Sequence, residues 1–192
     1  MEHAVRLAVL DRGEPAVRLL AAVGNLERAD GEAPVTSVIV LTEPRQLAWY
    51  AREADESILV DGDIGPGGTG QVTTEAVLTA LREARIDVVW IGQVPCQDQL
   101  ALVTACEEAG ISVVGPDSAT IRRLSDPGEI EAAAQRAGMS VDPEGRHAPL
   151  PRDRRWIEVD ILADAVGTVW ALGPRDVSVR RGAHLEIGRA HV

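Results

Sequence analysis

The sequence has very few aromatic residues and contains no lysine. Aromatic side chains make up 3% of the 192 residues and phenylalanine is absent. The hydrophobic core therefore has to be built from alanine, valine, leucine and isoleucine. All 19 basic residues are arginines, so the chain has no side-chain ammonium group with which to bind a phosphate or act in catalysis.

The excess of acidic residues gives the chain a formal net charge of −11. Phosphate contacts need a basic surface, so this charge argues against general nucleic-acid binding. Attraction to an anionic membrane surface is disfavoured for the same reason. The sequence also has no apolar run long enough to span a bilayer and no apolar leader at its start.

Cysteine and histidine give no sign of a metal site. The two cysteines are Cys96, in an expected loop, and Cys106, on the apolar side of an expected helix. We interpret both as free thiols in a reducing compartment, which makes the expected localisation cytoplasmic. The four histidines lack the spacing of metal ligands, so no metal is expected. They are His3, His147, His184 and His191.

Short β-branched runs alternate with stretches of helical period along residues 1–138. The clearest example combines strand Val88–Ile91, a helix closed by Gly110 and strand Ser112–Val114 into a βαβ unit. This repetition predicts an α/β domain built on a doubly wound, Rossmann-like parallel sheet. We expect residues 5–10 and 88–91 to be neighbouring strands at its centre.

Local signals place the remaining elements of this domain. Pro15 suits the start of a helix, and Thr73 or Thr74 suits the cap of another. Asp126 is expected to cap a third helix, with Glu129 completing a capping box. Further strands are expected at 35–41 and 57–60, and a short helix at 46–52.

The regular pattern stops after the α/β domain. Residues 139–155 are rich in proline and arginine and predict a linker. Residues 156–162 and 168–172 then alternate as a β-hairpin around the turn Asp164–Gly167. The region 156–185 is therefore expected to be a small β unit.

Three stretches resemble biotin carboxylases, the ATP-grasp subunits of acyl-CoA carboxylases such as acetyl-CoA and propionyl-CoA carboxylase. ACEEAGISVVGPDSATIRRLSD resembles the end of that family's N-terminal domain. LAVLDRGEPAVRLLAAV resembles its opening strand, its Asn-Arg-Gly-Glu turn and its first helix. WIEVDILADAVGTVWALGPRDVSVRRGAH resembles a strand pair of the ATP-grasp core. The resemblance implies a degenerate and truncated relative in which residues 156–185 are a remnant of that core.

The sequence departs from the family at the positions that carry its chemistry. Pro127 stands where the family has a lysine that touches the nucleotide phosphates, and proline has neither charge nor N–H. Trp156 replaces a histidine, and Ala183 and Leu185 replace a histidine and a lysine in the run that holds bicarbonate and biotin. Only residues 127–155 lie where the family has a whole domain with its ATP-binding lid.

Ligands of α/β sheets bind at the carboxyl ends of the strands, so turns there are candidate sites. The crevice candidates are Arg12, Gly13, Glu14, Gly92 and Gly115. The helix dipole alone also explains Glu14. Arg18 matches a basic position of the family's dimer contact, which makes it a candidate interface residue. The glycine-rich loop at 62–70 lacks the lysine and the context of a phosphate-binding loop, and we interpret it as a surface loop.

These observations favour a non-catalytic, biotin-carboxylase-like module of an acyl-CoA carboxylase, acting as an interaction or structural domain. No cofactor is expected for this chain, although the family uses ATP, Mg²⁺ and biotin. The expected partners are carboxyltransferase or biotin-carrier components, or a second copy bound through the first helix. There are two alternatives. The chain could belong to a working ATP-dependent biotin carboxylase that a partner or missing sequence completes, or it could be a small-molecule sensor.

The last residues have a different origin in our interpretation. Residues 187–192 read Ile-Gly-Arg-Ala-His-Val, the translation of ATC GGA AGA GCA CAC GTC. That DNA resembles a common short-read sequencing adapter, whose next codon in this frame is a stop, and Glu186 fits the preceding codon. We therefore interpret 186–192 as an adapter-derived tail with few tertiary contacts, and expect the natural gene to continue beyond Leu185.

Overall fold

The computed structural model describes two compact units, residues 1–139 and 140–192, and each is considered by itself. The described residues are 4–11, 13–30, 34–41, 49–60, 72–92, 99–139, 155–164, 166–178, 180–181 and 184–185. The glycine-rich loop at 62–70, nearly all of the expected linker and the tail at 186–192 lie outside them.

A sheet of five parallel strands forms the centre of the first unit, in the order β3-β2-β1-β4-β5. The strands are β1 (Val5–Leu10), β2 (Val35–Leu41), β3 (Glu56–Leu59), β4 (Val88–Ile91) and β5 (Ser112–Val114). β1 pairs with β2 along one edge and with β4 along the other, so that Leu7 lies opposite both Ser37 and Val88. The strand order reverses between β1 and β4. The predicted doubly wound α/β fold is therefore confirmed.

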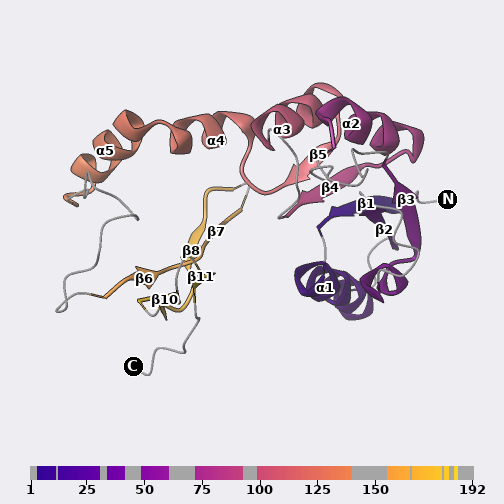
Figure 1. The fold of residues 1–192 in the computed structure, drawn as a ribbon, viewed down its shortest axis with the longest axis horizontal. Coiled ribbons are helices and arrows are strands. Elements are labelled where there is room, and N and C mark those ends of the chain that lie inside the picture. Colours follow the sequence, from indigo (N-terminus) through magenta and orange to yellow (C-terminus); the bar gives the residue numbers. More distant parts are fainter. Residues whose placement is uncertain are drawn as a thin grey trace. The chain divides into compact units, whose positions relative to one another are not determined.

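Helices cover both faces of this sheet (Figure 1). On one face lie α1 (Glu14–Asp30) and the short 3-10 helix η1 (Trp49–Glu53), and on the other lie α2 (Thr74–Glu83) and α3 (Gln99–Glu108). Two further helices, α4 (Ser118–Ser125) and α5 (Pro127–Arg136), follow β5. Within the described residues, no helix is both long enough and apolar enough to cross a membrane.

The carboxyl half of β1 is buried on both faces. Ala8, Val9 and Leu10 have no exposed surface. Because side chains alternate along a strand, Ala8 and Leu10 pack in the core cluster that includes α2 and α3, whereas Val9 packs in the cluster of α1 and η1. Every buried hydrophobic residue of the described part is Ala, Val, Leu, Ile or Cys. The scarcity of aromatic residues thus predicted the composition of the core.

Two local elements differ from the sequence-based expectation. The short helix expected at 46–52 is described as the 3-10 helix η1 over 49–53, and residues 42–48 lie outside the description. Helix α4 has no counterpart in the prediction, because it is short, polar on average and largely exposed. Its start is set by Asp117, whose Oδ1 accepts a hydrogen bond from the backbone N–H of Thr120 at 2.7 Å.

The second unit consists of short antiparallel strand pairs. The predicted hairpin is seen as β7 (Ile161–Ala163) paired with β8 (Val169–Ala171), and Asp164 Oδ1 closes its turn by accepting hydrogen bonds from the N–H groups of Val166 and Thr168. The strand predicted over 156–162 is interrupted between β6 (Ile157–Glu158) and β7, and β6 pairs with β9 (Arg175–Asp176) instead of with β8. A further pair is β10 (Arg180–Arg181) with β11 (His184–Leu185).

The hairpin β7–β8 has apolar side chains on both faces but little cover. Ile161, Leu162, Val169 and Trp170 are between 45% and 62% exposed. A two-stranded hairpin without a packed face is marginally stable in water. The stable core that the structure describes therefore lies in the first unit.

Three helices end in the same hydrogen-bonded cap, in which one residue adopts a left-handed backbone. At the ends of α3 and α5 this residue is a glycine, Gly110 with φ 75° and Gly138 with φ 69°. At the end of α2 it is Arg85 with φ 52°, followed by Ile86, whose N–H donates to the carbonyl of Leu81 at 3.0 Å. A side chain in this conformation costs free energy, so the cap of α2 is strained where the other two are not.

We predict that Arg85→Gly raises the free energy of unfolding by up to about 1 kcal/mol, because it relieves this strain. Arg85→Ala is the matched control: it removes the guanidinium but keeps the Cβ, and should leave the stability nearly unchanged. Urea denaturation followed by circular dichroism measures both variants. If Arg85→Gly is no more stable than Arg85→Ala, the assignment of strain to this backbone is wrong.

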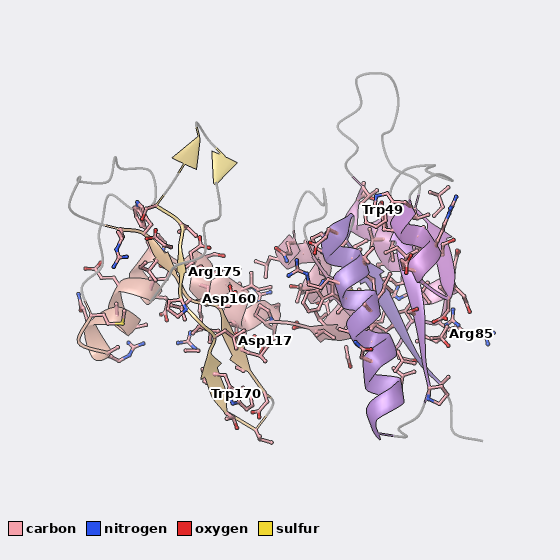
Figure 2. The ribbon with its side chains drawn as sticks, turned by 90° about the horizontal axis from the view of Figure 1, so that it is seen from below. Trp49, Arg85, Asp117, Asp160, Trp170 and Arg175 are labelled. Carbon is pink, nitrogen blue, oxygen red and sulfur yellow. The ribbon has the colours of Figure 1, made fainter. Side chains whose placement is uncertain are left out.

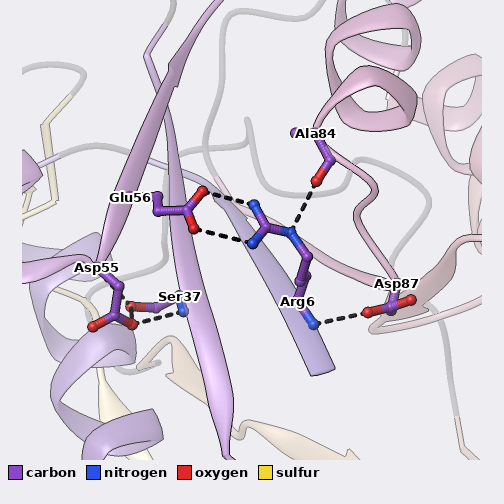
Figure 3. A network of polar contacts seen from close by, with 6 residues as sticks. All are labelled: Arg6, Ser37, Asp55, Glu56, Ala84 and Asp87. Carbon is purple, nitrogen blue, oxygen red and sulfur yellow. Dashed lines mark hydrogen bonds and ion pairs between the residues drawn. The ribbon is translucent and has the colours of Figure 1, made fainter. Parts of the chain in front are cut away.

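Charged side chains tie together the amino ends of the strands (Figure 3). The Arg6 guanidinium forms a two-point ion pair with Glu56, with Nη1–Oε1 and Nη2–Oε2 distances of 3.0 and 2.7 Å. Its Nε donates to the carbonyl of Ala84 at 2.9 Å, and the Arg6 backbone N–H donates to Asp87 Oδ2 at 2.8 Å. Arg6 thus connects β1 with β3, across β2, and with the turn that precedes β4.

A second polar pair joins β2 to the start of β3 (Figure 3). Asp55 Oδ2 accepts hydrogen bonds from the hydroxyl of Ser37 at 2.6 Å and from its backbone N–H at 2.8 Å. These bonds, the hydroxyl one first, lower the pKa of Asp55 because they stabilise its ionised form. The resulting stability is complete above the unfolded-state pKa and is lost as the pH falls through the lower folded-state pKa.

We predict that Ser37→Ala lowers the free energy of unfolding by about 1 kcal/mol at neutral pH. The loss should shrink in acid, where Asp55 becomes protonated in the wild-type protein. Urea denaturation at neutral pH and at a pH below the ordinary aspartate range tests this. Ser57→Ala, on exposed β3, should be nearly neutral at both pH values. A loss for Ser37→Ala that is the same at both would refute the pKa argument.

Candidate functional site

The carboxyl ends of β1 and β4 meet where the strand order reverses. The backbone N–H of Gly92, directly after β4, donates to the carbonyl of Leu10 at 2.9 Å. Asp11, which follows Leu10, therefore lies beside Gly92. Open α/β sheets bind ligands at such a reversal. Gly92 thus lies at the switch point, and a ligand crevice there stays a prediction.

The carboxylate of Asp11 lies directly against the Cα of Gly92. Asp11 is only 5% exposed, and a Cβ added to Gly92 would stand 1.9 Å from its Oδ2 and 2.3 Å from its Cγ. Glycine is thus required at position 92 by the close approach of an acidic side chain. The sequence analysis predicted Gly92 as a site residue but not Asp11, which had the features of an ordinary turn residue. Its position directly after a buried apolar strand was the available signal.

The turn from β1 into α1 contains the other candidates of this crevice. Gly13 has φ 67° and open space around an added Cβ, so its backbone conformation, not crowding, requires glycine. Glu14 is the first residue of α1 and forms an ion pair with Arg18 one turn later. The candidate interface residue Arg18 is therefore exposed but already paired. Arg12 lies outside the described residues.

Gly115 lies apart from Gly92 and lines a hollow of its own. It follows β5, which β4 separates from β1. The cavity beside it has a volume of about 300 Å³, and its lining includes the acidic residues Glu107 and Asp117. The predicted crevice residues thus divide between the β1–β4 switch point and an acidic hollow at the edge of the sheet.

The described residues offer an acidic acceptor at the switch point but little other reactive chemistry. No group of three or more His, Cys, Asp or Glu side chains in the described part could hold a metal ion. Burial raises the pKa of the Cys106 thiol to about 11, so this thiol is protonated at neutral pH. It is a core residue, as its place on the apolar side of α3 predicted. Cys96 lies outside the described residues.

In the second unit, Trp156 and Ser178 lie side by side. The backbone N–H of Trp156 donates to Ser178 Oγ at 2.8 Å, and its carbonyl accepts from Val177 N at 2.8 Å. Ser178 in turn donates its N–H to Asp176 Oδ1 at 3.0 Å, and its hydrogen bonding lowers the pKa of Asp176. Neither the indole nor the hydroxyl of this group can exchange a proton near neutral pH as a histidine could.

Two further departures were predicted in this unit. Ala183 lies outside the described residues, and only the backbone of Leu185 is described, in β11. Asp176, which the sequence did not single out, is the acidic group nearest to Ser178 in the chain.

Pro127 occupies the first position of α5. Asp126 Oδ1 caps this helix by accepting hydrogen bonds from the N–H groups of Gly128 and Glu129, at 2.8 and 3.3 Å. The Glu129 carboxylate forms an ion pair with Arg123 at 3.5 Å, so the expected capping box is seen only from the aspartate side. Pro127 supplies neither charge nor N–H at this helix start.

We predict that Gly92→Ala lowers the free energy of unfolding by about 1–3 kcal/mol, because the new methyl group displaces the Asp11 carboxylate. In an Asp11→Ala background the same substitution should cost less, since the two closest atoms are absent. Urea denaturation of the four proteins completes a double-mutant cycle. An equal loss in both backgrounds would show that the clash lies elsewhere.

The first unit matches known proteins most clearly. The family model described as "Biotin carboxylase, N-terminal domain" matches residues 3–121. Pyruvate carboxylase of Staphylococcus aureus is 25% identical over 150 residues, which are 78% of this chain and 12% of that protein. Biotin carboxylase of Halalkalibacterium halodurans is 25% identical over 138 residues, which are 72% of this chain and 28% of that protein. The chain thus spans a minor part of these relatives.

Solved structures agree with this match. The crystal structure of a complete multifunctional pyruvate carboxylase from Rhizobium etli is 26% identical with a TM-score of 0.74, covering 94% of this chain and 16% of that one. The biotin carboxylase domain of a single-chain bacterial carboxylase shares the fold, with a TM-score of 0.72 and 24% identity, covering 95% of this chain and 49% of that one. The doubly wound sheet and the match over residues 3–121 show that this chain belongs to the biotin carboxylase N-terminal domain family.

Proposed function

We propose that this chain is a biotin-carboxylase-like module of a biotin-dependent carboxylase and has no catalytic activity of its own. The observation that carries the proposal is the short connection between the two units. α5 occupies residues 127–136, so only residues 137–156 remain before β6 begins at Ile157. A compact domain needs about 50 residues or more, so a nucleotide-binding lid domain does not fit there.

The residues that replace the family's catalytic groups support the same conclusion. ATP-dependent carboxylation requires cations and Mg²⁺ to neutralise the transferring phosphoryl group. Pro127 offers no charge, Trp156 stands where the resemblance has a histidine, and the sequence contains no lysine. These residues do not fit the family's ATP, Mg²⁺ and biotin, so we assign no catalytic step to them.

The proposed role is structural or interactive, with carboxyltransferase or biotin-carrier components as partners. The R. etli relative is described as complete and multifunctional, and another structural neighbour as a single-chain, multi-domain long-chain acyl-CoA carboxylase. The relatives include pyruvate carboxylases, so the acceptor is broader than the acyl-CoA class that the sequence suggested. A second copy bound through α1 is the other proposed partner, since Arg18 and Ala21 are exposed on that helix.

The second candidate function is an active biotin carboxylase whose missing parts come from another chain or from further sequence. The observation in its favour is that the chain spans only 12% of the S. aureus pyruvate carboxylase and 28% of the H. halodurans biotin carboxylase. In that case the nucleotide lid and the missing cations would come from a partner chain or from residues beyond this sequence.

We predict that the purified chain does not hydrolyse ATP in response to bicarbonate or free biotin. Pro127→Lys should not restore activity, because a single cation does not replace the lid domain. Phosphate release with Mg²⁺ measures this, and H. halodurans biotin carboxylase serves as the positive control. Biotin-dependent turnover by the purified chain would refute the proposal.

Affinity capture with the native protein tests the interaction role. Capture of a carboxyltransferase or biotin-carrier component, without turnover, supports the module. Turnover that appears only when the captured partner is present supports the completed enzyme instead.

A further inference from the structure

An open hollow lies at the amino ends of β1, β4 and β5, opposite the strand ends at which Asp11 meets Gly92. Its volume is about 570 Å³, within the range of small-molecule sites. The lining combines apolar side chains, among them Val5, Val88 and Ile111, with the arginines Arg82 and Arg85. The hollow therefore has one apolar part and one cationic part.

The two arginines in the lining are not neutralised by a neighbouring carboxylate of the described part. Elsewhere in the described part, most arginines are neutralised by carboxylates, as in the ion pairs of Arg6, Arg18, Arg123, Arg155 and Arg175. Arg82 and Arg85 are exposed and form no ion pair with any described residue. The carboxylate in the lining, Asp87, accepts the backbone N–H of Arg6.

Arg85 is also held in a strained backbone conformation. It fills, with φ 52°, the cap position that Gly110 and Gly138 fill in α3 and α5. A side chain at this position costs stability, and such costs concentrate at functional sites. The arginine adds a second guanidinium to the hollow, one helical turn after Arg82. Figure 2 shows Arg85 at the outer margin of the first unit, open to solvent.

The neighbouring hollow has the opposite charge. It shares residues 110–112 with the arginine-lined hollow, but its side chains include Glu107 and Asp117. With two arginines and one aspartate, the first hollow favours an anion more than the second, whose charged lining residues are both acidic. The charge of a ligand should therefore decide which of the two hollows it enters.

We propose that the hollow lined by Arg82 and Arg85 binds a small amphipathic anion. The guanidinium groups would hold a carboxylate or phosphate by charge-assisted hydrogen bonds, and Val5, Val88 and Ile111 would cover an apolar tail. The site lies in the first unit and does not depend on the proposed function.

Nuclear magnetic resonance titration of the ¹⁵N-labelled full chain tests the proposal, with hexanoate and hexyl phosphate as probes. We expect saturable shifts of the amides of residues 85–88 and 110–112 with at least one probe, and the tighter probe identifies the head group. Hexanol, which has the tail without the charge, should give no saturable shifts. Absence of saturation with both anions, or equal binding of hexanol, would overturn the proposal.

Arginine variants locate the binding charge. Arg82→Gln and Arg85→Gln should each weaken binding about tenfold or more, whereas Arg136→Gln, at the exposed end of α5, should bind like the wild type. Arg85→Gly keeps the fold, since glycine suits this backbone, and should lose binding to the same extent as Arg85→Gln. Unchanged affinity in Arg85→Gly would remove Arg85 from the site and contradict the proposal.

Discussion

Strand β1 is packed on both faces and hydrogen-bonded along both edges, and the rest of the first unit is arranged around it. Its carboxyl half, Ala8 to Leu10, has no exposed surface. Because β2 and β4 run parallel to β1 on its two sides, each needs a crossover, and the helices of these crossovers cover opposite faces. The same arrangement places the reversal of strand order beside β1, where Asp11 meets Gly92.

The carboxyl and amino ends of the parallel strands carry different charged groups. The carboxyl edge holds a buried carboxylate at the switch point. The amino edge holds the Arg6–Glu56 ion pair and the hollow lined by Arg82 and Arg85. Pro127 and Trp156, where the resemblance has a lysine and a histidine, lie outside the five strands. The five-stranded fold therefore does not depend on these two positions, since a fold and a site are separable.

The fold was largely predictable from the sequence because its signals are local. Residues 35–41 form a strand with the predicted bounds. Thr73, one of the two predicted caps, caps α2 by accepting a hydrogen bond from Ala76 N. The contact of Asp11 with Gly92 and the network of Arg6 were not predictable, because they join residues distant in the sequence. The left-handed backbone of Arg85 was not predictable, because this helix cap has an arginine where such caps normally have a glycine.

The central claim is that the first unit is a folded module through its own core, centred on β1. Hydrogen exchange of the full chain, resolved by residue, tests this most directly. The claim predicts that the amides of Val9 and Val89 exchange only through global unfolding, while those of the hairpin β7–β8 exchange through separate opening at much lower free energy. Equal exchange free energies for hairpin and β1 amides would show that the chain unfolds as one unit, and would contradict it.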